Sequence, residues 1–304
     1  MGTQGITGTF IDEITWDIPS QNWGPEEWRA DFDAMQAIGI DTVIIIRGGL
    51  RGQCVFPSKV VGWNRDHDLA GLFLQETAAR GMKLFFGTYD SAAHIHDGEV
   101  RWREEFAISK PFIEEVLARY GDYPSFHGWY LAQEFGAALP GARELFLAVG
   151  GLCKERTPEK KTLISPFYPS RLLYPGQPVP PDAFADQWRD MLQGVEVVDY
   201  CAFQDGSAPM DELDAYARAA RGVCDEAGIT LWSNVETFSR GMPVKFPPQD
   251  FRIVREKIRL TTPYVAKHIT FEFSHFMSPN SVYGAARNLY RRYREAFCPA
   301  PDNA

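Results

Sequence analysis

The sequence lacks the long apolar runs, basic clusters and paired cysteines that mark several common protein classes. None of its apolar segments reaches the 18 or more uninterrupted residues that span a bilayer, so we expect a soluble protein without a membrane partner. Its net charge of −9 opposes phosphate backbones, so we expect no nucleic-acid partner. The five cysteines are scattered and form no C-x-x-C motif, which excludes a zinc ribbon and predicts reduced, mostly buried thiols.

Signals for secretion and for nucleotide cofactors are also missing. The first ten residues, MGTQGITGTF, have neither the basic nor the apolar region of a secretory leader. We therefore expect a cytoplasmic location, or secretion if a signal peptide preceded this sequence. No G-x-G-x-x-G follows the first expected strand, RGGLRG at 47–52 has a different spacing, and no P-loop occurs. We expect no cofactor and no bound metal.

The sequence does contain a regular alternation of short β-branched or aromatic segments with longer amphipathic ones. This alternation is typical of βα units around a parallel sheet, and eight units are present. Eight uninterrupted units favour a closed barrel over an open doubly wound sheet. We therefore predict one α/β domain over residues 1–304, a (β/α)8 TIM barrel. The expected strands are 8–14, 41–47, 83–89, 126–134, 161–168, 198–205, 230–236 and 268–274.

The expected helices have recognisable starts and ends. Residues 25–39 begin with a proline and two glutamates, and their apolar side chains recur at three- and four-residue spacing. Segments 66–81 and 210–228 show the same pattern. In AIGID, ARGMK and EAGIT a glycine follows the helix and a new strand begins at once. These repeated junctions support the barrel prediction.

Polar residues gather at the carboxyl ends of the expected strands, where parallel barrels build their binding sites. Alternation along the seventh strand directs Trp232, Asn234 and Glu236 into the barrel. The eighth strand is expected to direct Thr270, Glu272 and Ser274 inward, and Ile269, Phe271 and Phe273 toward the helices. The strand-end polar residues are Asp12, Glu13, Arg47, Tyr89, Asp90, Glu134, Ser165, Tyr168, Gln204, Asp205, Asn234, Glu236, Glu272, Ser274 and His275.

Two acidic residues come from strands on opposite sides of the barrel mouth. Glu134 closes the fourth expected strand and Glu236 closes the seventh. Taken alone, a strand-end glutamate more often caps a helix or forms a salt bridge. As a pair, two carboxyl groups suit glycosidic bond cleavage, since one protonates the leaving oxygen while the other attacks the anomeric carbon or activates water. We expect Arg47, at the end of the second strand, to keep the attacking carboxylate ionised.

Aromatic residues, 13% of the chain, offer flat faces on which sugar rings can stack. Trp232 has the inward parity for this role, although core packing is an equal alternative for it. The stacking candidates are Trp16, Trp63, Trp129, Tyr168 and Trp232. The further candidate substrate contacts are Asp12, Glu13, Tyr89, His94, Gln204, Asp205, Asn234 and Glu272.

Several segments resemble known families. An Arg closing the second strand, a Glu after W-Y-L-x-x closing the fourth, and a Glu closing the seventh resemble the clan of retaining (β/α)8 glycoside hydrolases. More specifically, the chain resembles a bacterial family of candidate glycoside hydrolases, the domain of unknown function 4434. The segments that carry this resemblance are GTFIDEITWDIPSQNWGPEEW at 8–28, GWYLAQE at 128–134, ISPFY at 164–168, FQDG at 203–206, LWSNVETF at 231–238 and FEFSHFMSP at 271–279.

The resemblance to the clan implies a retaining hydrolase of an O-glycosidic bond in an oligosaccharide or glycoside. It implies Glu134 as acid/base and Glu236 as nucleophile, whose carboxyl groups lie about 5 to 5.5 Å apart in retaining enzymes. The residue before the acid is Asn in most of the clan and Gln133 here, and it is expected to contact the sugar. Proline-rich segments at 166–181 and 243–248 predict long loops, which favour action at chain ends or on a short substrate.

Two other functions fit the same residues. The first is a sugar isomerase or epimerase that binds Mg²⁺ or Mn²⁺ through oxygen-rich ligands, although strand parity turns His275 outward. Its ligands would be Glu134, Asp205, Glu236, Glu272 and His275. The second is a non-catalytic carbohydrate-binding barrel, which needs the aromatic residues but not two opposed acids. His94 and His96 lie in a loop, where an exposed polar pair is favoured over a metal site.

Overall fold

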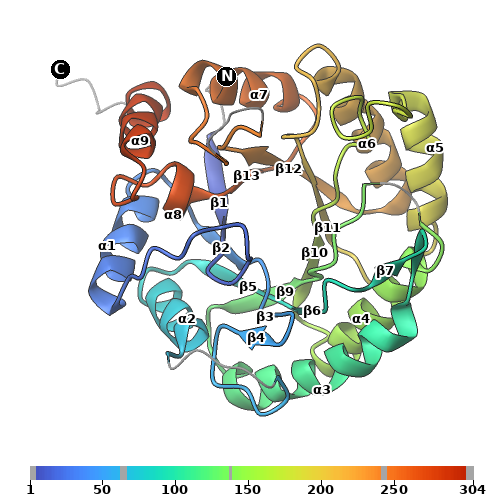
Figure 1. The fold of residues 1–304 in the computed structure, drawn as a ribbon, viewed down its shortest axis with the longest axis horizontal. Coiled ribbons are helices and arrows are strands. Elements are labelled where there is room, and N and C mark those ends of the chain that lie inside the picture. The colour runs from blue at the N-terminus through green and yellow to red at the C-terminus, as the bar shows by residue number, and fades with distance from the viewer. Residues whose placement is uncertain (1–4, 62–66, 137–138, 241–244, 299–304) are drawn as a thin grey trace.

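The computed structural model describes residues 5–61, 67–136, 139–240 and 245–298. Its centre is a closed barrel of parallel strands, which the long helices surround (Figure 1). All eight expected strands pair around this barrel, so the predicted (β/α)8 TIM-barrel fold is confirmed. The barrel strands are β1 (Ile6–Ile11), β2 (Thr42–Ile45), β5 (Lys83–Gly87), β9 (Phe126–Tyr130), β10 (Lys161–Ile164), β11 (Tyr200–Gln204), β12 (Thr230–Glu236) and β13 (His268–Phe271).

The helices alternate with these strands, and the three expected from their caps are present. After each of those three a glycine has a positive φ, +87° at Gly39, +64° at Gly81 and +70° at Gly228, a conformation that glycine adopts readily. None of the described helices is long and apolar enough to cross a membrane. The helices are α1 (Pro25–Gln36), α2 (Leu69–Ala79), α3 (Trp102–Tyr120), α4 (Ala142–Arg156), α5 (Pro181–Leu192), α6 (Leu213–Ala227), α7 (Phe251–Thr261), α8 (Phe273–Phe276) and α9 (Gly284–Phe297).

Two small sheets extend the carboxyl end of the barrel. The first consists of β3 (Gly49–Leu50), β4 (Gln53–Cys54) and β6 (Tyr89–Asp90), in which β3 pairs with both neighbours. The second is the hairpin of β7 (Ile95–His96) and β8 (Glu99–Val100). Because they follow β2 and β5 in the chain, these sheets build part of the rim around the barrel mouth.

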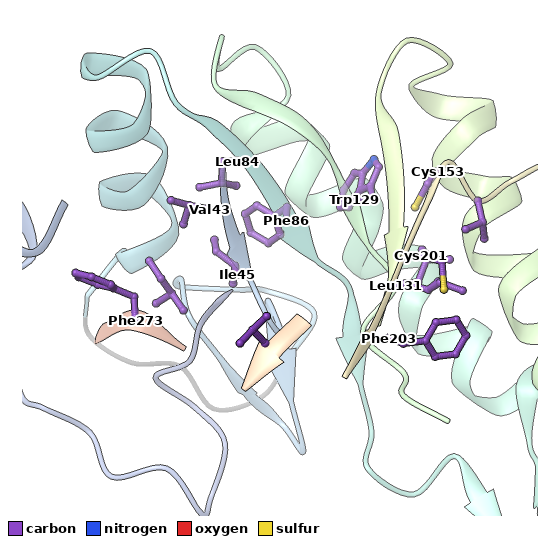
Figure 2. Close-up of a cluster of buried hydrophobic side chains, with 14 of the residues drawn as sticks. Val43, Ile45, Leu84, Phe86, Trp129, Leu131, Cys153, Cys201, Phe203 and Phe273 are labelled. Carbon is purple, nitrogen blue, oxygen red and sulfur yellow. The ribbon is translucent and has the colours of Figure 1, made fainter. Parts of the chain in front are cut away.

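Two apolar layers hold the barrel together. The inner layer fills the barrel with side chains such as Phe10, Phe85 and Trp232, so the predicted inward direction of Trp232 is confirmed. The outer layer packs the strands against the helices; Figure 2 shows part of it, including Phe86, Trp129 and Cys201. Each large side chain buried in these layers contributes roughly 1.5–3 kcal/mol. The cysteines are free thiols, and those at 54, 153, 201 and 224 are buried, as predicted.

The direction of side chains on the last strand differs from the prediction. Ile269 belongs to the inner layer and Phe271 packs against it, while His268 on the opposite face contacts Thr261 of α7. The expected directions of Ile269 and Phe271 were therefore wrong: both side chains lie on the inner face of the strand and not on the face toward the helices. Both faces of a barrel strand are buried, so the sequence offers no clear alternation of apolar and polar residues to fix the parity.

The strand is also shorter than expected, because it ends at Phe271. Glu272 is the N-cap of the short helix α8, and its carboxylate accepts hydrogen bonds from the backbone N–H groups of Ser274 and His275. Residues 273 and 274 are therefore helical, although they were predicted to extend the strand. Glu272 takes the cap role that a lone strand-end glutamate commonly has.

Candidate active site

A pocket of about 170 Å³ opens at the carboxyl end of the barrel strands. Both Glu134 and Glu236 line it, so residues from the fourth and seventh βα units meet at one cavity, as the sequence suggested. Arg240, Phe246 and Phe271 also line this pocket. The other predicted residues that share its wall are Asp12, Trp16, Arg47, Gln204 and Asn234.

Glu134 is held by groups from inside the barrel. Tyr130, four residues earlier at the end of β9, donates its hydroxyl hydrogen to Glu134 Oε1 at 2.6 Å, and Arg47 Nη2 lies 3.4 Å from Oε2. Burial raises the pKa of Glu134, and although the Arg47 guanidinium and the Tyr130 hydroxyl lower it, burial outweighs them. A carboxyl group with a raised pKa keeps its proton to higher pH, which is the property that a general acid needs.

A chain of charges continues behind Arg47. Its Nε donates to Asp90 Oδ2 at 3.0 Å, and His94 Nδ1 lies 3.0 Å from Asp90 Oδ1. Burial raises the pKa of Asp90, but the hydrogen bond from His94 and the charge of Arg47 outweigh it, so the net shift is downward. Burial lowers the pKa of His94, but Asp90 outweighs it, so the net shift is upward. Asp90 therefore stays ionised and holds Arg47 against Glu134.

Glu236 has a different set of partners. Only 1% of its side chain is exposed, and both its carboxylate oxygens accept hydrogen bonds from Arg240, at 3.3 Å from Nε and 2.9 Å from Nη2. Arg240 itself is 44% exposed. The cation beside Glu236 is thus Arg240, which lies beyond the strand in sequence, whereas Arg47 binds Glu134. The expectation that Arg47 supports Glu236 was therefore wrong.

The main chain of Glu236 is fixed by a buried ion pair. Asp205 Oδ1 accepts a hydrogen bond from Glu236 N at 2.9 Å and one from Lys257 Nζ at 2.7 Å. Lys257, from α7, also donates to the carbonyl oxygen of Glu236 at 3.2 Å. Burial raises the pKa of Asp205 to about 6, although Lys257 opposes this shift. The pair anchors the end of β12, and a fully buried pair of this kind leaves an uncompensated charge if one partner is removed.

Gly206, directly after Asp205, lies against the carboxylate of Glu236. A Cβ atom at this position would lie 1.5 Å from Glu236 Oε2, far closer than any real contact. Only a residue without a side chain allows this approach. The FQDG segment of the sequence therefore supplies two features of the site, the carboxylate that anchors Glu236 and the glycine that makes room for it.

Other predicted contacts lie outside the pocket. Gln133 is buried and donates to Glu105 and to the carbonyl of Tyr89, away from the cavity that Glu134 lines. Tyr89 and Tyr168 belong to the outer apolar layer. These three side chains are not among those that line the cavity.

The predicted contacts His94 and Asp205 likewise do not line this cavity; they support Arg47 and Glu236 from behind, as described above. Glu13 and Glu272 lie in a buried network around His275 instead. Burial lowers the pKa of His275, but the Glu272 carboxylate outweighs it and raises the pKa to about 9.

The aromatic candidates separate in the same way. Trp129 is buried in the outer layer, Trp232 stacks on Tyr200 inside the barrel, and Tyr168 stacks on Phe203. None of these three lines the pocket. Trp63 lies outside the described residues. Trp16 is the stacking candidate that lines the cavity, and it is 63% exposed.

The ligand set suggested for a metal-dependent isomerase is not assembled. Glu272 and His275 bind each other away from the pocket, and Asp205 binds Lys257. Among the described residues, the acidic and histidine side chains that come within mutual ligand distance are Asp90, His94 and Glu105. Arg47 and Gln133 donate to two of these carboxylates, so hydrogen bonds and the charge of Arg47 already account for this cluster.

Reasoning from sequence did not assign roles to Tyr130, Arg240 or Lys257. Tyr130 lies four residues before Glu134 and Arg240 four residues after Glu236, so each was near enough in sequence to be tested as a partner. Lysine in a helix is usually exposed, and nothing in the sequence near Lys257 indicates that its side chain contacts the end of a strand.

The fold and the site together define a (β/α)8 barrel in which Glu134 and Glu236 line one pocket at the barrel mouth. The chain belongs to the family described as a domain of unknown function, DUF4434, whose model matches residues 6–283. No curated protein sequence matches it significantly.

Solved structures with the same fold include one with high sequence similarity. A protein from Bacteroides thetaiotaomicron VPI-5482, provisionally described as an alpha-L-fucosidase, is 40% identical, with a TM-score of 0.94 over 98% of this chain and 95% of its own. An endo-1,4-beta-D-mannanase from Thermotoga petrophila RKU-1 is 12% identical, with a TM-score of 0.60 over 97% of this chain and 100% of its own. The intracellular xylanase of Thermoanaerobacterium saccharolyticum is 10% identical, with a TM-score of 0.51 over 87% and 84%. The last two show similarity of fold alone.

Proposed function

We propose that the protein is a retaining glycoside hydrolase in which Glu134 is the acid/base and Glu236 the nucleophile. The observation that carries this proposal is that one pocket holds both Glu134 and Glu236, whose carboxyl groups have unlike partners. Burial raises the pKa of Glu134, as a general acid requires, while both carboxylate oxygens of Glu236 accept hydrogen bonds from the Arg240 guanidinium. The similarity to a provisionally described alpha-L-fucosidase adds support.

In the first step an oxygen of Glu236 attacks the anomeric carbon. The bond to the leaving oxygen breaks, and Glu134 gives that oxygen its proton, so the products are a glycosyl ester on Glu236 and the free alcohol. In the second step Glu134 takes a proton from water, which attacks the same carbon and releases Glu236. Arg240 hydrogen-bonds both oxygens of Glu236 before substrate binds. Each oxygen keeps a second lone pair for the attack, and the hydrogen bond to the attacking oxygen weakens as that oxygen loses its negative charge.

Activity is tested first with a panel of aryl glycosides that includes 4-nitrophenyl alpha-L-fucoside. For a substrate that is hydrolysed, Glu236→Gln should lower kcat by about 10⁴-fold or more, because a neutral amide cannot attack. Glu134→Gln should lose less on an aryl glycoside than on one with a poor leaving group, since an activated leaving group needs little protonation. Glu144→Gln on α4, an exposed carboxylate outside the pocket, is the control and should keep wild-type activity.

Proton NMR of the first product formed tests the stereochemistry. A retaining reaction releases the anomer of the substrate, and release of the opposite anomer would make the reaction inverting. Hydrolysis by Glu236→Gln at the wild-type rate would overturn the assignment of Glu236. Binding of sugars without turnover of any glycoside would instead favour a carbohydrate-binding barrel.

A further inference from the structure

Trp16 has an unusual position for a large apolar residue. It lies in the segment between β1 and α1, lines the pocket that holds Glu134 and Glu236, and is 63% exposed. Single exposed aromatic residues are common on protein surfaces, so exposure alone indicates nothing. The informative feature is that this exposed indole forms part of the wall of the candidate active site.

One face of the Trp16 ring is already covered. The guanidinium carbon of Arg51 lies 3.9 Å from the ring centroid, a close cation–π contact. Arg51 is in the turn between β3 and β4, and its backbone N–H donates to the carbonyl of Asp90 at 3.2 Å, which ties this turn to the rim. Arg51 does not line the pocket. The indole is thus supported from behind, and its remaining surface contributes to the pocket wall.

Polar groups lie beside the indole. Asp17 follows Trp16 in the chain and also lines the pocket, and its Oδ2 lies 3.3 Å from Lys245 Nζ. A pyranose ring presents an apolar C–H face and an edge of hydroxyl groups. The indole matches the face, and the carboxylate of Asp17 can accept hydrogen bonds from the hydroxyl edge. An aromatic aglycone would match the indole but would offer Asp17 no hydroxyl group.

We propose that Trp16, supported by Arg51, binds a second sugar ring of the substrate, next to the ring whose bond is cleaved between Glu134 and Glu236. The substrate is then an oligosaccharide of at least two units, and Asp17 recognises a hydroxyl group of the second sugar. This inference rests on the proposed function, because the second sugar position is defined as the neighbour of the sugar whose bond is cleaved.

The test compares two substrates that share the same reacting sugar. One is a disaccharide and the other is the glycosyl fluoride, which has no second ring. Trp16→Ala should lower the ratio of kcat/KM for the disaccharide to that for the fluoride by about tenfold, mainly through KM, because the lost contact is of the size of an aromatic stacking pair. Trp16→Phe should recover most of this loss, and Arg51→Ala should give a smaller loss in the same direction.

Leu172→Ala is the matched control, because Leu172 is 60% exposed and does not line this pocket. It should leave the ratio of the two kcat/KM values unchanged. An unchanged ratio in Trp16→Ala would overturn the inference. So would a loss confined to aryl glycosides, which would assign the indole to an aromatic aglycone.

Binding measurements separate this inference from the proposed function. Calorimetry with a panel of oligosaccharides on Glu236→Gln, with and without Trp16→Ala, requires no turnover. If Trp16→Ala weakens binding while the wild type hydrolyses no glycoside, the second sugar position stands and the hydrolase assignment fails. If the wild type hydrolyses a disaccharide and Trp16→Ala changes neither its KM nor its binding, the hydrolase assignment stands and the sugar position fails.

Discussion

The two glutamates of the pocket, Glu134 and Glu236, are supported in opposite ways. The Glu134 side chain is held by Arg47 and Tyr130, and Arg47 is only 12% exposed and is held in turn by Asp90. At Glu236 the firm support acts on the main chain, through Asp205 and Lys257, whereas the carboxylate itself contacts the half-exposed Arg240.

This difference matches the two proposed roles. A general acid has to keep a defined proton affinity, and buried charges that cannot rearrange provide this. A nucleophile has to form a bond to carbon, so its backbone must be fixed while its oxygens can be freed. Arg240 is 44% exposed, so its guanidinium can turn toward water more readily than that of Arg47, which is 12% exposed. Buried and exposed partners thus divide the site into a fixed side and a displaceable side.

The largest effect is expected from breaking the buried pair below Glu236. Lys257→Met leaves Asp205 as a buried carboxylate without its cation, and we expect the free energy of unfolding to fall by about 3–5 kcal/mol. Urea denaturation measures this loss. The double variant Lys257→Met, Asp205→Asn should recover a large part of it, since the amide oxygen can still accept from Glu236 N.

The same variant should also change how stability depends on pH. Asp205 has a folded-state pKa of about 6, above its ordinary value of 3.8, so its protonated form is favoured in the folded state. Its contribution to stability is present below pH 3.8 and is lost as pH rises through 6. Without Lys257 this pKa rises further, so Lys257→Met should be less destabilised at pH 5 than at pH 8. Equal destabilisation at both pH values would contradict an ion-pair role for Lys257.

An intermediate effect is expected from Arg47 on the other side of the pocket. In Arg47→Met the cation that lowers the pKa of Glu134 is gone, so this pKa rises further above its ordinary value. Glu134 then keeps its proton to higher pH, and the alkaline limb of the kcat/KM profile should shift to higher pH. We expect kcat/KM at its optimum to fall by about 10²-fold, the size of an orientation effect. Arg47→Lys keeps the charge and should shift the alkaline limb to higher pH by a smaller amount. An alkaline limb at the wild-type pH in Arg47→Met would show that Arg47 does not set the pKa of Glu134.

The sequence predicted the barrel because each unit carries its own local signals. Strand segments, helix caps and terminal glycines such as Gly39 depend on neighbours in the chain, so they are readable without the fold. The pairing of Glu134 with Glu236 in one pocket was also predictable, because the carboxyl ends of barrel strands always meet. The roles of these two residues stay predictions.

Side-chain partners were less predictable. Both faces of β13 are buried, so the sequence does not show which of its side chains point into the barrel. Glu272, which was predicted to point inward, is the N-cap of a helix instead. Arg47 could reach either carboxyl group from its strand, and only the three-dimensional arrangement selects Glu134. Lys257 reaches Glu236 from a helix, over a separation of 21 residues, for which no local pattern exists.

The smallest effect on stability is expected from Arg240, and it tests the displaceable side directly. Arg240→Ala should lower the free energy of unfolding by about 1–3 kcal/mol, because it removes the guanidinium from the buried carboxylate of Glu236 and leaves pocket water to replace it. Arg221→Ala is the matched control: Arg221 is 48% exposed and also pairs with a carboxylate four residues away, Asp225, on the outer surface. Arg240→Ala should lose more stability than Arg221→Ala in urea denaturation, because Glu236 is 1% exposed whereas Asp225 is 55% exposed, and kcat/KM should change in Arg240→Ala alone. A loss of more than about 3 kcal/mol in Arg240→Ala would place Arg240 with Arg47 and Lys257 as a fixed support, and the contrast between the two sides of the pocket would then disappear.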